Sequence, residues 1–142
     1  MRHGEGTCLY SDGTVYKGEW KFDLWHGQGT IIFPDEDKYS GQFKYGKIHG
    51  QGIYFTAEGG TYDGQWQDGE RNGFGAMVLA DGTRYEGQWK DDLRHGQGVL
   101  TYPDGSVYRG EWRSGERHGQ GKITYPDGRM EEGMWEKDLF KG

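Results

Sequence analysis

The fold is decided by the stretch from Gly98 to Trp112, which reads GVLTYPDGSVYRGEW. Its centre, Pro103-Asp104-Gly105, has the composition of a three-residue hairpin turn, because proline presets φ at about −65° and glycine can take the positive φ that closes the turn. On both sides of the turn, successive side chains alternate with the period of two that is typical of β-strands. The stretch therefore predicts a β-hairpin.

The turn also fixes the register of the predicted hairpin. Tyr102 faces Ser106, and Leu100 faces Tyr108. Leu100, Tyr108 and Trp112 then fall on one apolar side, because residues two apart in a strand point the same way. The other side carries charged and amide side chains that suit water. We expect a hairpin with one apolar and one polar face.

The same pattern returns every 23 residues without an insertion or deletion. In five of the six copies an aromatic residue stands two residues before a glycine and a second ring two residues after it. These rings are Tyr16, Trp20, Tyr39, Phe43, Tyr62, Trp66, Tyr85, Trp89, Tyr108 and Trp112, and in the last copy Glu131 precedes Trp135. A strict period of this length is typical of arrays whose units bury apolar surface only against their neighbours.

We therefore predict an all-β fold, an elongated, single-layer antiparallel meander of six 23-residue hairpin repeats, twisted and curved. The hairpins are expected at residues 6–20, 29–43, 52–66, 75–89, 98–112 and 121–135 of one array spanning residues 1–142. Met130, Met134, Leu139 and Phe140 gather near the end. Because these side chains are too apolar for a free end, we expect another repeat, a helix or a partner to cover them and the chain to be part of a longer protein.

The connectors between hairpins hold the most regular glycines of the chain. Such regularity predicts tight structural turns that need an unusual φ. These are Gly27, Gly29, Gly50, Gly52, Gly73, Gly75, Gly96, Gly98, Gly119 and Gly121. The glycine between the two rings, such as Gly110, has two interpretations: it leaves room for a ring from the adjacent strand, or it forms a β-bulge.

Composition excludes several classes of protein. Only 32% of the 142 residues are hydrophobic, but the 15% of aromatic residues stand at fixed spacing, which a disordered chain would not show. The net charge of −6 and the absence of a basic patch argue against nucleic-acid binding. A single cysteine fits a reducing compartment, and there is neither an apolar run long enough to span a bilayer nor a signal peptide. We expect a soluble, cytoplasmic chain.

No residue pattern predicts catalysis. Five histidines, including His26, occupy one slot before a glycine, but equivalent positions lie roughly 10 Å apart, so we expect them to bond their own turns and not to share a metal. The His-Gly-Gln-Gly segments lack the third glycine and the helix of a dinucleotide site. Cys8 falls in the apolar row without a base beside it. We expect no catalytic residues, no metal and no cofactor.

Tyr-x-Gly-x-Trp, a spaced His-Gly-x-Gly and then Asp-Gly, recurring at 23 residues from His3-Gly4 to Gly142, resemble the MORN (membrane occupation and recognition nexus) repeat family. The resemblance implies elongated hairpin arrays that act as scaffolds in cytoskeletal, ciliary or membrane-contact assemblies. Some copies depart from the pattern, with Phe43 in a tryptophan slot and Asn72 in a histidine slot.

Two functions follow from the sequence. The first is a non-catalytic scaffold in which the eleven rings named above form a groove for a helix or extended segment of a partner protein, or for a second copy in a homodimer, with the outer half of each ring left free. The second, which the resemblance implies, is phospholipid binding, or a regulatory arm of an enzyme such as a lipid kinase or methyltransferase. Cations on one edge, Lys47, Arg71, Arg94 and Arg117, would serve lipid, whereas the net charge disfavours it.

Overall fold

The computed structural model describes residues 3–142, which form β-strands and turns with no helix. The chain divides into two compact units, residues 1–70 (unit 1) and 71–142 (unit 2). Unit 1 holds β1 (Gly4–Leu9), β2 (Val15–Lys21), β3 (Leu24–Ile32), β4 (Lys38–Lys44), β5 (Lys47–Phe55) and β6 (Thr61–Gln67). Unit 2 holds β7 (Glu70–Val78), which begins one residue before it, β8 (Arg84–Lys90), β9 (Leu93–Thr101), β10 (Val107–Arg113), β11 (Glu116–Thr124), β12 (Met130–Glu136) and β13 (Leu139–Phe140).

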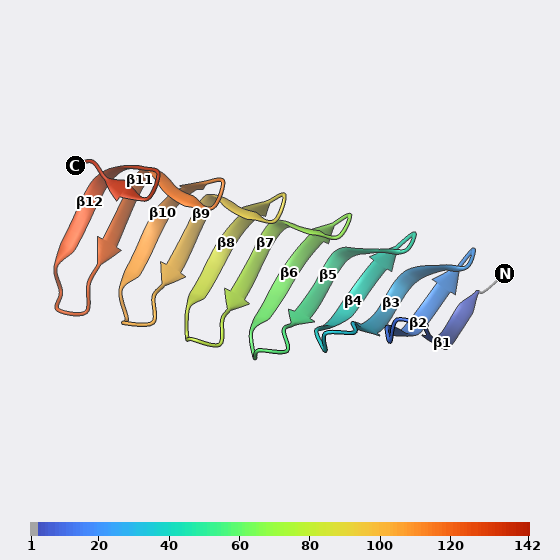
Figure 1. The fold of residues 1–142 in the computed structure, drawn as a ribbon. Helices are drawn as coiled ribbons and strands as arrows, with labels where there is room; N and C mark the ends of the chain where they lie inside the picture. Colours follow the sequence, from blue (N-terminus) through green and yellow to red (C-terminus); the bar gives the residue numbers. More distant parts are fainter. Residues whose placement is uncertain (1–2) are drawn as a thin grey trace. The chain divides into compact units, whose positions relative to one another are not determined.

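Within each unit, strands that are consecutive in the chain are hydrogen-bonded, antiparallel neighbours (Figure 1). The predicted all-β antiparallel meander is confirmed. The predicted register is confirmed as well, since Leu100 pairs with Tyr108 and the backbone N–H of Tyr102 donates to the carbonyl of Ser106 at 2.8 Å. Gly105 closes that turn with φ of 94°. Local turn chemistry therefore sets the hairpins as expected.

The connection to the following hairpin is a two-residue turn that the sequence analysis did not place. Asp91 and Asp92 have φ of 50° and 69°, and Lys90 pairs with Leu93 across them. Two successive residues with positive φ are characteristic of type I′ hairpin turns. Equivalent turns lie at residues 22–23, 45–46, 68–69, 114–115 and 137–138. The strands are thus joined by tight turns at one end and longer loops at the other.

The ten connector glycines predicted as turns lie inside strands, so that assignment was wrong. Gly27, Gly50, Gly73, Gly96 and Gly119 do have positive φ, between 67° and 100°. They use it at a β-bulge, because the pairing of β8 with β9 shifts register between Gly87 and Trp89. A bulge and a turn both favour a left-handed glycine, and the sequence does not distinguish them.

The second connector glycine has a different role. A Cβ on Gly52 would lie 2.0 Å from Oη of Tyr39, so the tyrosine ring occupies the space where a side chain would stand. The same holds for Gly29, Gly98 and Gly121. The glycine between the rings belongs to the bulge: a Cβ on Gly41 would come within 2.4 Å of the Cα of Gly52. For the glycine between the rings the bulge interpretation therefore applies, and room for a ring from the adjacent strand is provided by the second connector glycine instead.

Each strand that carries two of the repeated rings, such as β2, bends at the glycine between them. Tyr16 and Trp20 are four residues apart, which is roughly 13 Å along a straight strand, yet their ring centroids are 5.0 Å apart. Figure 1 shows the strands curving toward the two-residue turns. The two rings face each other on the inside of the bend, and the core of each unit lies there.

At the end of unit 2, Phe140 packs against Trp135 with ring centroids 5.1 Å apart. Met130, Met134 and Leu139 are 58%, 46% and 61% exposed. Within the described residues these side chains are only partly covered. The cover comes from β13, a strand of two residues.

Candidate functional site

The repeated rings form a continuous edge-to-face series in each unit, here called the aromatic ladder. In unit 1, Tyr16 contacts Phe43 at 5.2 Å, Phe43 contacts Tyr39 at 5.1 Å, and Tyr39 contacts Trp66 at 5.6 Å between centroids. Unit 2 repeats this arrangement with Tyr85, Trp89, Tyr108, Trp112 and Trp135. Each of these tyrosines packs against a ring of its own repeat and a ring of the next, so neighbouring repeats share their core.

The polar atoms of the ladder are satisfied inside the fold. Tyr39 donates its hydroxyl proton to the carbonyl of Gln42 at 2.9 Å, and Trp112 donates from Nε1 to the carbonyl of Gly98 at 3.2 Å. Burial raises the pKa of Tyr16 and of Tyr108 to about 12. These hydroxyls remain neutral hydrogen-bond donors at physiological pH, and their role is structural.

The ladder rings are only 0–8% exposed. We expected the outer half of each ring to stay free, but neighbouring rings and the bent backbone cover both sides of each tyrosine. The sequence pattern showed which rings share a face and did not show the bend that encloses them. A ligand on this face would contact the side chains that surround the ladder. The buried ladder rings would hold those side chains in place.

In unit 1 those side chains are a second set of rings, here called the unit 1 face: Tyr10, Trp25, Phe33 and Tyr54. All are half-buried. Trp25 stacks on Tyr16 with centroids 5.1 Å apart and an interplanar angle of 7°, and donates from Nε1 to the Tyr10 hydroxyl at 2.9 Å. Phe33 lies 5.9 Å from Tyr54. Sequence reasoning missed Trp25, because its slot holds Ile48, Arg71, Arg94 and Arg117 in the next four repeats and an aromatic residue again only at Phe140.

In unit 2 the slot of Trp25 holds arginine, and this row differs from what the sequence suggested. Arg71, Arg94 and Arg117 lie on strands β7, β9 and β11, not in loops along an edge. Their guanidinium groups stand 4.5, 4.6 and 4.7 Å from the rings of Trp89, Trp112 and Trp135. Stacking of this kind is favourable and holds the charge over the ladder.

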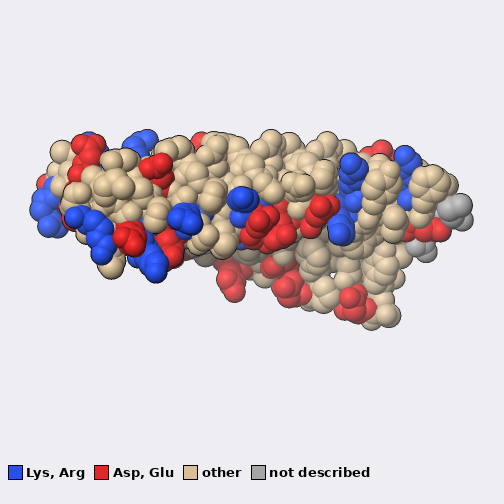
Figure 2. Space-filling model, turned by 90° about the horizontal axis from the view of Figure 1, so that it is seen from above, with Lys and Arg blue, Asp and Glu red and all other residues tan. Residues whose placement is uncertain are grey.

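Two of these arginines are also paired with carboxylates. Arg71 Nε lies 3.1 Å from Asp92 Oδ1, and Arg117 Nε lies 3.2 Å from Asp138 Oδ1. On the face seen in Figure 2, Lys and Arg side chains are interspersed with Asp and Glu. These pairings weaken the electrostatic argument for lipid, because cations attract anionic headgroups only where their charge is unopposed.

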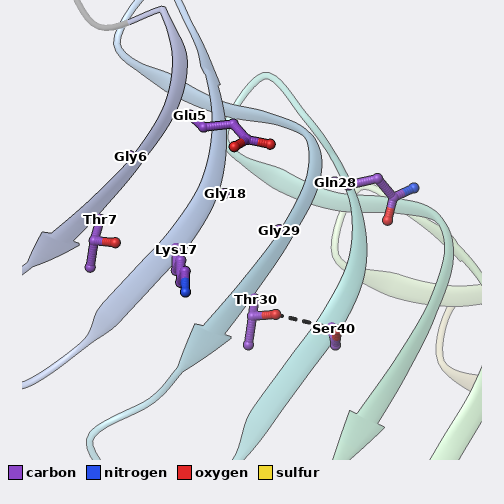
Figure 3. Close-up of a pocket in the computed structure, with 9 residues that line it drawn as sticks. All are labelled: Glu5, Gly6, Thr7, Lys17, Gly18, Gln28, Gly29, Thr30 and Ser40. Carbon is purple, nitrogen blue, oxygen red and sulfur yellow. Dashed lines mark hydrogen bonds between the residues drawn. The ribbon is translucent and has the colours of Figure 1, made fainter.

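The polar face carries shallow hollows over the glycine pairs. In unit 1 a cavity of about 590 Å³ is lined by Glu5, Gly6, Thr7, Lys17, Gly18, Gln28, Gly29, Thr30 and Ser40. Figure 3 shows Glu5 and Gln28 on one side of the glycines and the other side chains across from them. A hollow of about 430 Å³ in unit 2 includes Phe74 and Arg109. Neither holds a nucleophile with an adjacent base.

Glutamine and glutamate beside the bulge have a role that the sequence analysis did not assign. Gln42 Oε1 accepts a hydrogen bond from the backbone N–H of Gln51 at 2.7 Å, and Gln88 Oε1 accepts one from Gln97 at 2.8 Å. Glu19 and Glu111 do the same. Side chains expected simply to face water therefore also complete the backbone hydrogen bonds of the bulge. Their restriction to Glu or Gln in five repeats was the available signal.

The histidines bond turns, as expected, but the turn of the following hairpin and not their own. In unit 1, Nδ1 of His26 accepts a long hydrogen bond from Tyr45 N at 3.4 Å, and His3 and His49 do the same with Phe22 and Asp68 at 3.5 Å. Cys8 is half-buried on β1. Across residues 3–142, no three His, Cys, Asp or Glu side chains cluster as a metal site would require. No helix there could span a membrane.

Comparison with known proteins identifies the repeat. The family model described as MORN repeat matches six consecutive segments, residues 1–15, 16–38, 39–61, 62–84, 85–107 and 108–128. The chain belongs to the MORN repeat family. Its copies of the MORN repeat run through both units, and the matched segments begin at the ladder tyrosines Tyr16, Tyr39, Tyr62, Tyr85 and Tyr108. Among curated proteins, no relative matches this MORN chain significantly.

Similar chains are also found among solved structures. The TCP domain of SAS-4 from Drosophila melanogaster, in complex with a proline-rich motif of Ana2, is 13% identical, with 92% of this chain and 90% of that chain covered and a TM-score of 0.43. The TCP10c domain of the same fly protein is 13% identical with 93% of both chains covered and a TM-score of 0.45. The CPAP G-box domain is 16% identical over 91% and 97% of the chains, with a TM-score of 0.40. The family assignment rests on the repeat match.

Proposed function

We propose that this MORN chain is a non-catalytic protein-interaction scaffold whose aromatic side binds a segment of a partner protein. The eleven ladder rings form the floor of the binding groove, and the unit 1 face supplies the contacts. The observation that carries this proposal is the set of half-buried rings of Tyr10, Trp25, Phe33 and Tyr54, which lie beside the buried rings of the aromatic ladder.

The chemistry of the unit 1 face suits a protein segment. Large, rigid rings with a polar atom at the rim give contact area at little cost in conformational entropy, and tyrosine and tryptophan are enriched where proteins bind each other. The Tyr10 hydroxyl, which accepts from Trp25 Nε1, can still donate its own proton to a backbone carbonyl. A helix or an extended segment fits such a groove, and a second copy of the chain is the homodimeric version of the same contact.

The setting follows from the family and not from the geometry. The resemblance to MORN repeats implies a scaffold in a cytoskeletal, ciliary or membrane-contact assembly. We propose that this chain works in such an assembly in the cytoplasm. We also propose that the chain is one array within a longer protein.

The test uses substitutions that other repeats already carry. Trp25→Arg copies the slot of Arg71, and Tyr54→Met copies the slot of Met77, so the double variant should fold while its unit 1 face loses two rings. The matched control is Phe74→Gln on the polar face, where the slot holds Gln28 and Gln97 in other repeats.

Proteins retained from native cells by the immobilised chain would be identified, and the affinity of the purified partner measured by calorimetry. The double variant should weaken that affinity at least about tenfold, which is about 1.4 kcal/mol. Phe74→Gln should leave it unchanged. Equal affinity for the double variant, with an unchanged circular dichroism spectrum and melting temperature, would refute the groove. Sedimentation at increasing concentration separates a homodimer from binding to another protein.

A further inference from the structure

The three arginines of unit 2 share one arrangement with the two-residue turn beside them. Arg71 donates from Nη2 to the carbonyl of Asp92 at 3.0 Å, and Asp92 N donates to the carbonyl of Arg71 at 3.0 Å. Arg117 and Asp138 make the same two bonds at 2.7 and 3.1 Å. The guanidinium is thereby fixed between the turn and the aromatic ladder.

In both pairs the aspartate side chain completes the arrangement. Asp92 Oδ1 accepts from the backbone N–H of Arg71 at 2.7 Å and from its Nε at 3.1 Å. Asp138 Oδ1 accepts from the same two donors of Arg117 at 2.8 and 3.2 Å. One carboxylate oxygen therefore sits where a backbone N–H and a guanidinium N–H converge.

Arg94 has the same frame without the carboxylate. It donates from Nη2 to the carbonyl of Gly115 at 3.1 Å, and Gly115 N donates to the carbonyl of Arg94 at 2.9 Å. Gly115 occupies the slot of Asp92 and Asp138 and has no side chain to offer. Among the described residues, no carboxylate forms an ion pair with Arg94.

The missing carboxylate matters because Arg94 is half-buried among aromatic rings. Its guanidinium lies 4.6 Å from the ring of Trp112 and 5.8 Å from that of Tyr85. Burial lowers the pKa of Arg94, because it disfavours the charged form and no ion pair offsets the loss of water. A partly desolvated guanidinium is stabilised strongly by a carboxylate that reaches it, since charge-assisted hydrogen bonds are stronger away from bulk water.

We propose that Arg94 binds the carboxylate of a glutamate or aspartate side chain in a partner protein, with one oxygen in the position that Asp92 and Asp138 take in the neighbouring repeats. The site rests on the proposed interaction function and gives it a specificity element. Arg94 is half-buried beside the rings of Trp112 and Tyr85, and a small free anion would make no use of those rings. A carboxylate carried on an apolar segment gains contact with the rings as well.

The decisive variant fills the proposed site with a carboxylate of the protein itself. Gly115→Asp restores the aspartate of the other repeats, and its backbone already suits that residue: φ is 84° at Gly115, 69° at Asp92 and 68° at Asp138. A Cβ there would meet only Leu93 Cδ2 at an ordinary 3.6 Å. The matched control is Ser114→Asp, which adds the same charge one residue away, in the slot of Asp91.

The probe is a capped tripeptide, leucine-glutamate-leucine, compared with leucine-glutamine-leucine in a titration of the ¹⁵N-labelled chain followed by NMR. The glutamate peptide should shift the Nε–H and backbone N–H signals of Arg94 and bind about tenfold more tightly than the glutamine peptide. Gly115→Asp should remove that difference, whereas Ser114→Asp should retain it within about twofold.

Equal binding of the two peptides, or an unchanged response in Gly115→Asp, would overturn the site. Tighter binding of inorganic phosphate than of the glutamate peptide at Arg94 would overturn the assignment of a carboxylate. The proposed function fails separately: if Trp25→Arg with Tyr54→Met binds its partner unchanged while the peptide result at Arg94 holds, the unit 1 groove is wrong and the Arg94 site stands.

Discussion

Replacing a single glycine under a tyrosine ring tests whether the ring or the backbone requires that glycine. Gly52→Ala places a methyl group where the ring of Tyr39 lies, and Gly6→Ala makes the same change in the first repeat, where no tyrosine ring lies over it. Both glycines lie in strands and neither has a positive φ. The two variants therefore differ in the presence of the ring.

The magnitude follows from the distances. A Cβ on Gly52 would be 2.0 Å from Oη and 2.3 Å from Cζ of Tyr39, against an ordinary contact of roughly 3.5–4 Å. The ring must move by about 1.5 Å, which overpacks the ladder at a cost of about 2 kcal/mol and breaks the hydrogen bond to Gln42 at about 1 kcal/mol. Gly52→Ala should therefore lower the free energy of unfolding by about 3 kcal/mol. On Gly6, Cβ would meet Trp20 Nε1 at an ordinary 3.5 Å, so Gly6→Ala should change stability by less than about 1 kcal/mol.

Urea denaturation followed by circular dichroism gives the free energy of unfolding of each variant. Thermal melting should show a drop of about 10 °C for Gly52→Ala, because each kcal/mol corresponds to about 2–4 °C in a chain of this size. Equal losses in the two variants would refute the reasoning, since the backbone alone would then account for the requirement.

Three further outcomes follow from the same packing. Gln88→Ala should lose about 1 kcal/mol in urea denaturation, because the bulge N–H of Gln97 loses its acceptor, and Gln88→Glu should not, since Glu19 serves in that slot. Phe22→Asn should gain about 0.5–1 kcal/mol, because asparagine adopts the φ of 52° more readily than phenylalanine; a lower melting temperature would contradict this. Buried tyrosines such as Tyr16, with its pKa of about 12 against about 10 in the unfolded chain, should keep stability constant below pH 10 and reduce it as the pH rises from 10 to 12. Tyrosinate absorbance recorded beside the unfolding curve at each pH checks the coupling.

The hairpins could be predicted because their determinants are local. Pro103-Asp104-Gly105 specifies its turn type, and the turn fixes the pairing of Leu100 with Tyr108. The second turn was missed because its marker is irregular: Asp68-Gly69 has the Asp-Gly pair typical of a type I′ turn, whereas Asp91-Asp92 lacks the glycine. The regular glycines nearby, such as Gly96, carry the positive φ expected of a turn but serve the bulge instead.

The aromatic side could be predicted only in part. Period-two counting places Tyr108 and Trp112 on one face, but the bulge sets three residues of the next strand against one, and counting along the sequence does not show this. Arg94 lies on the aromatic side, beside Trp112, although its position near a turn suggested a solvent-facing edge. The near-complete burial of the rings depends on the bend at the glycine pair, which is a three-dimensional property with no periodic signature.

The sharing of each tyrosine ring between two repeats constrains how such a gene can change. A junction such as Tyr16 against Phe43 has the same form as Tyr39 against Trp66, so recombination that removes or duplicates a whole 23-residue block joins surfaces that already match. Insertion of a single codon inside a strand would instead turn the following rings toward solvent. We expect versions of this protein to differ in length by whole 23-residue repeats.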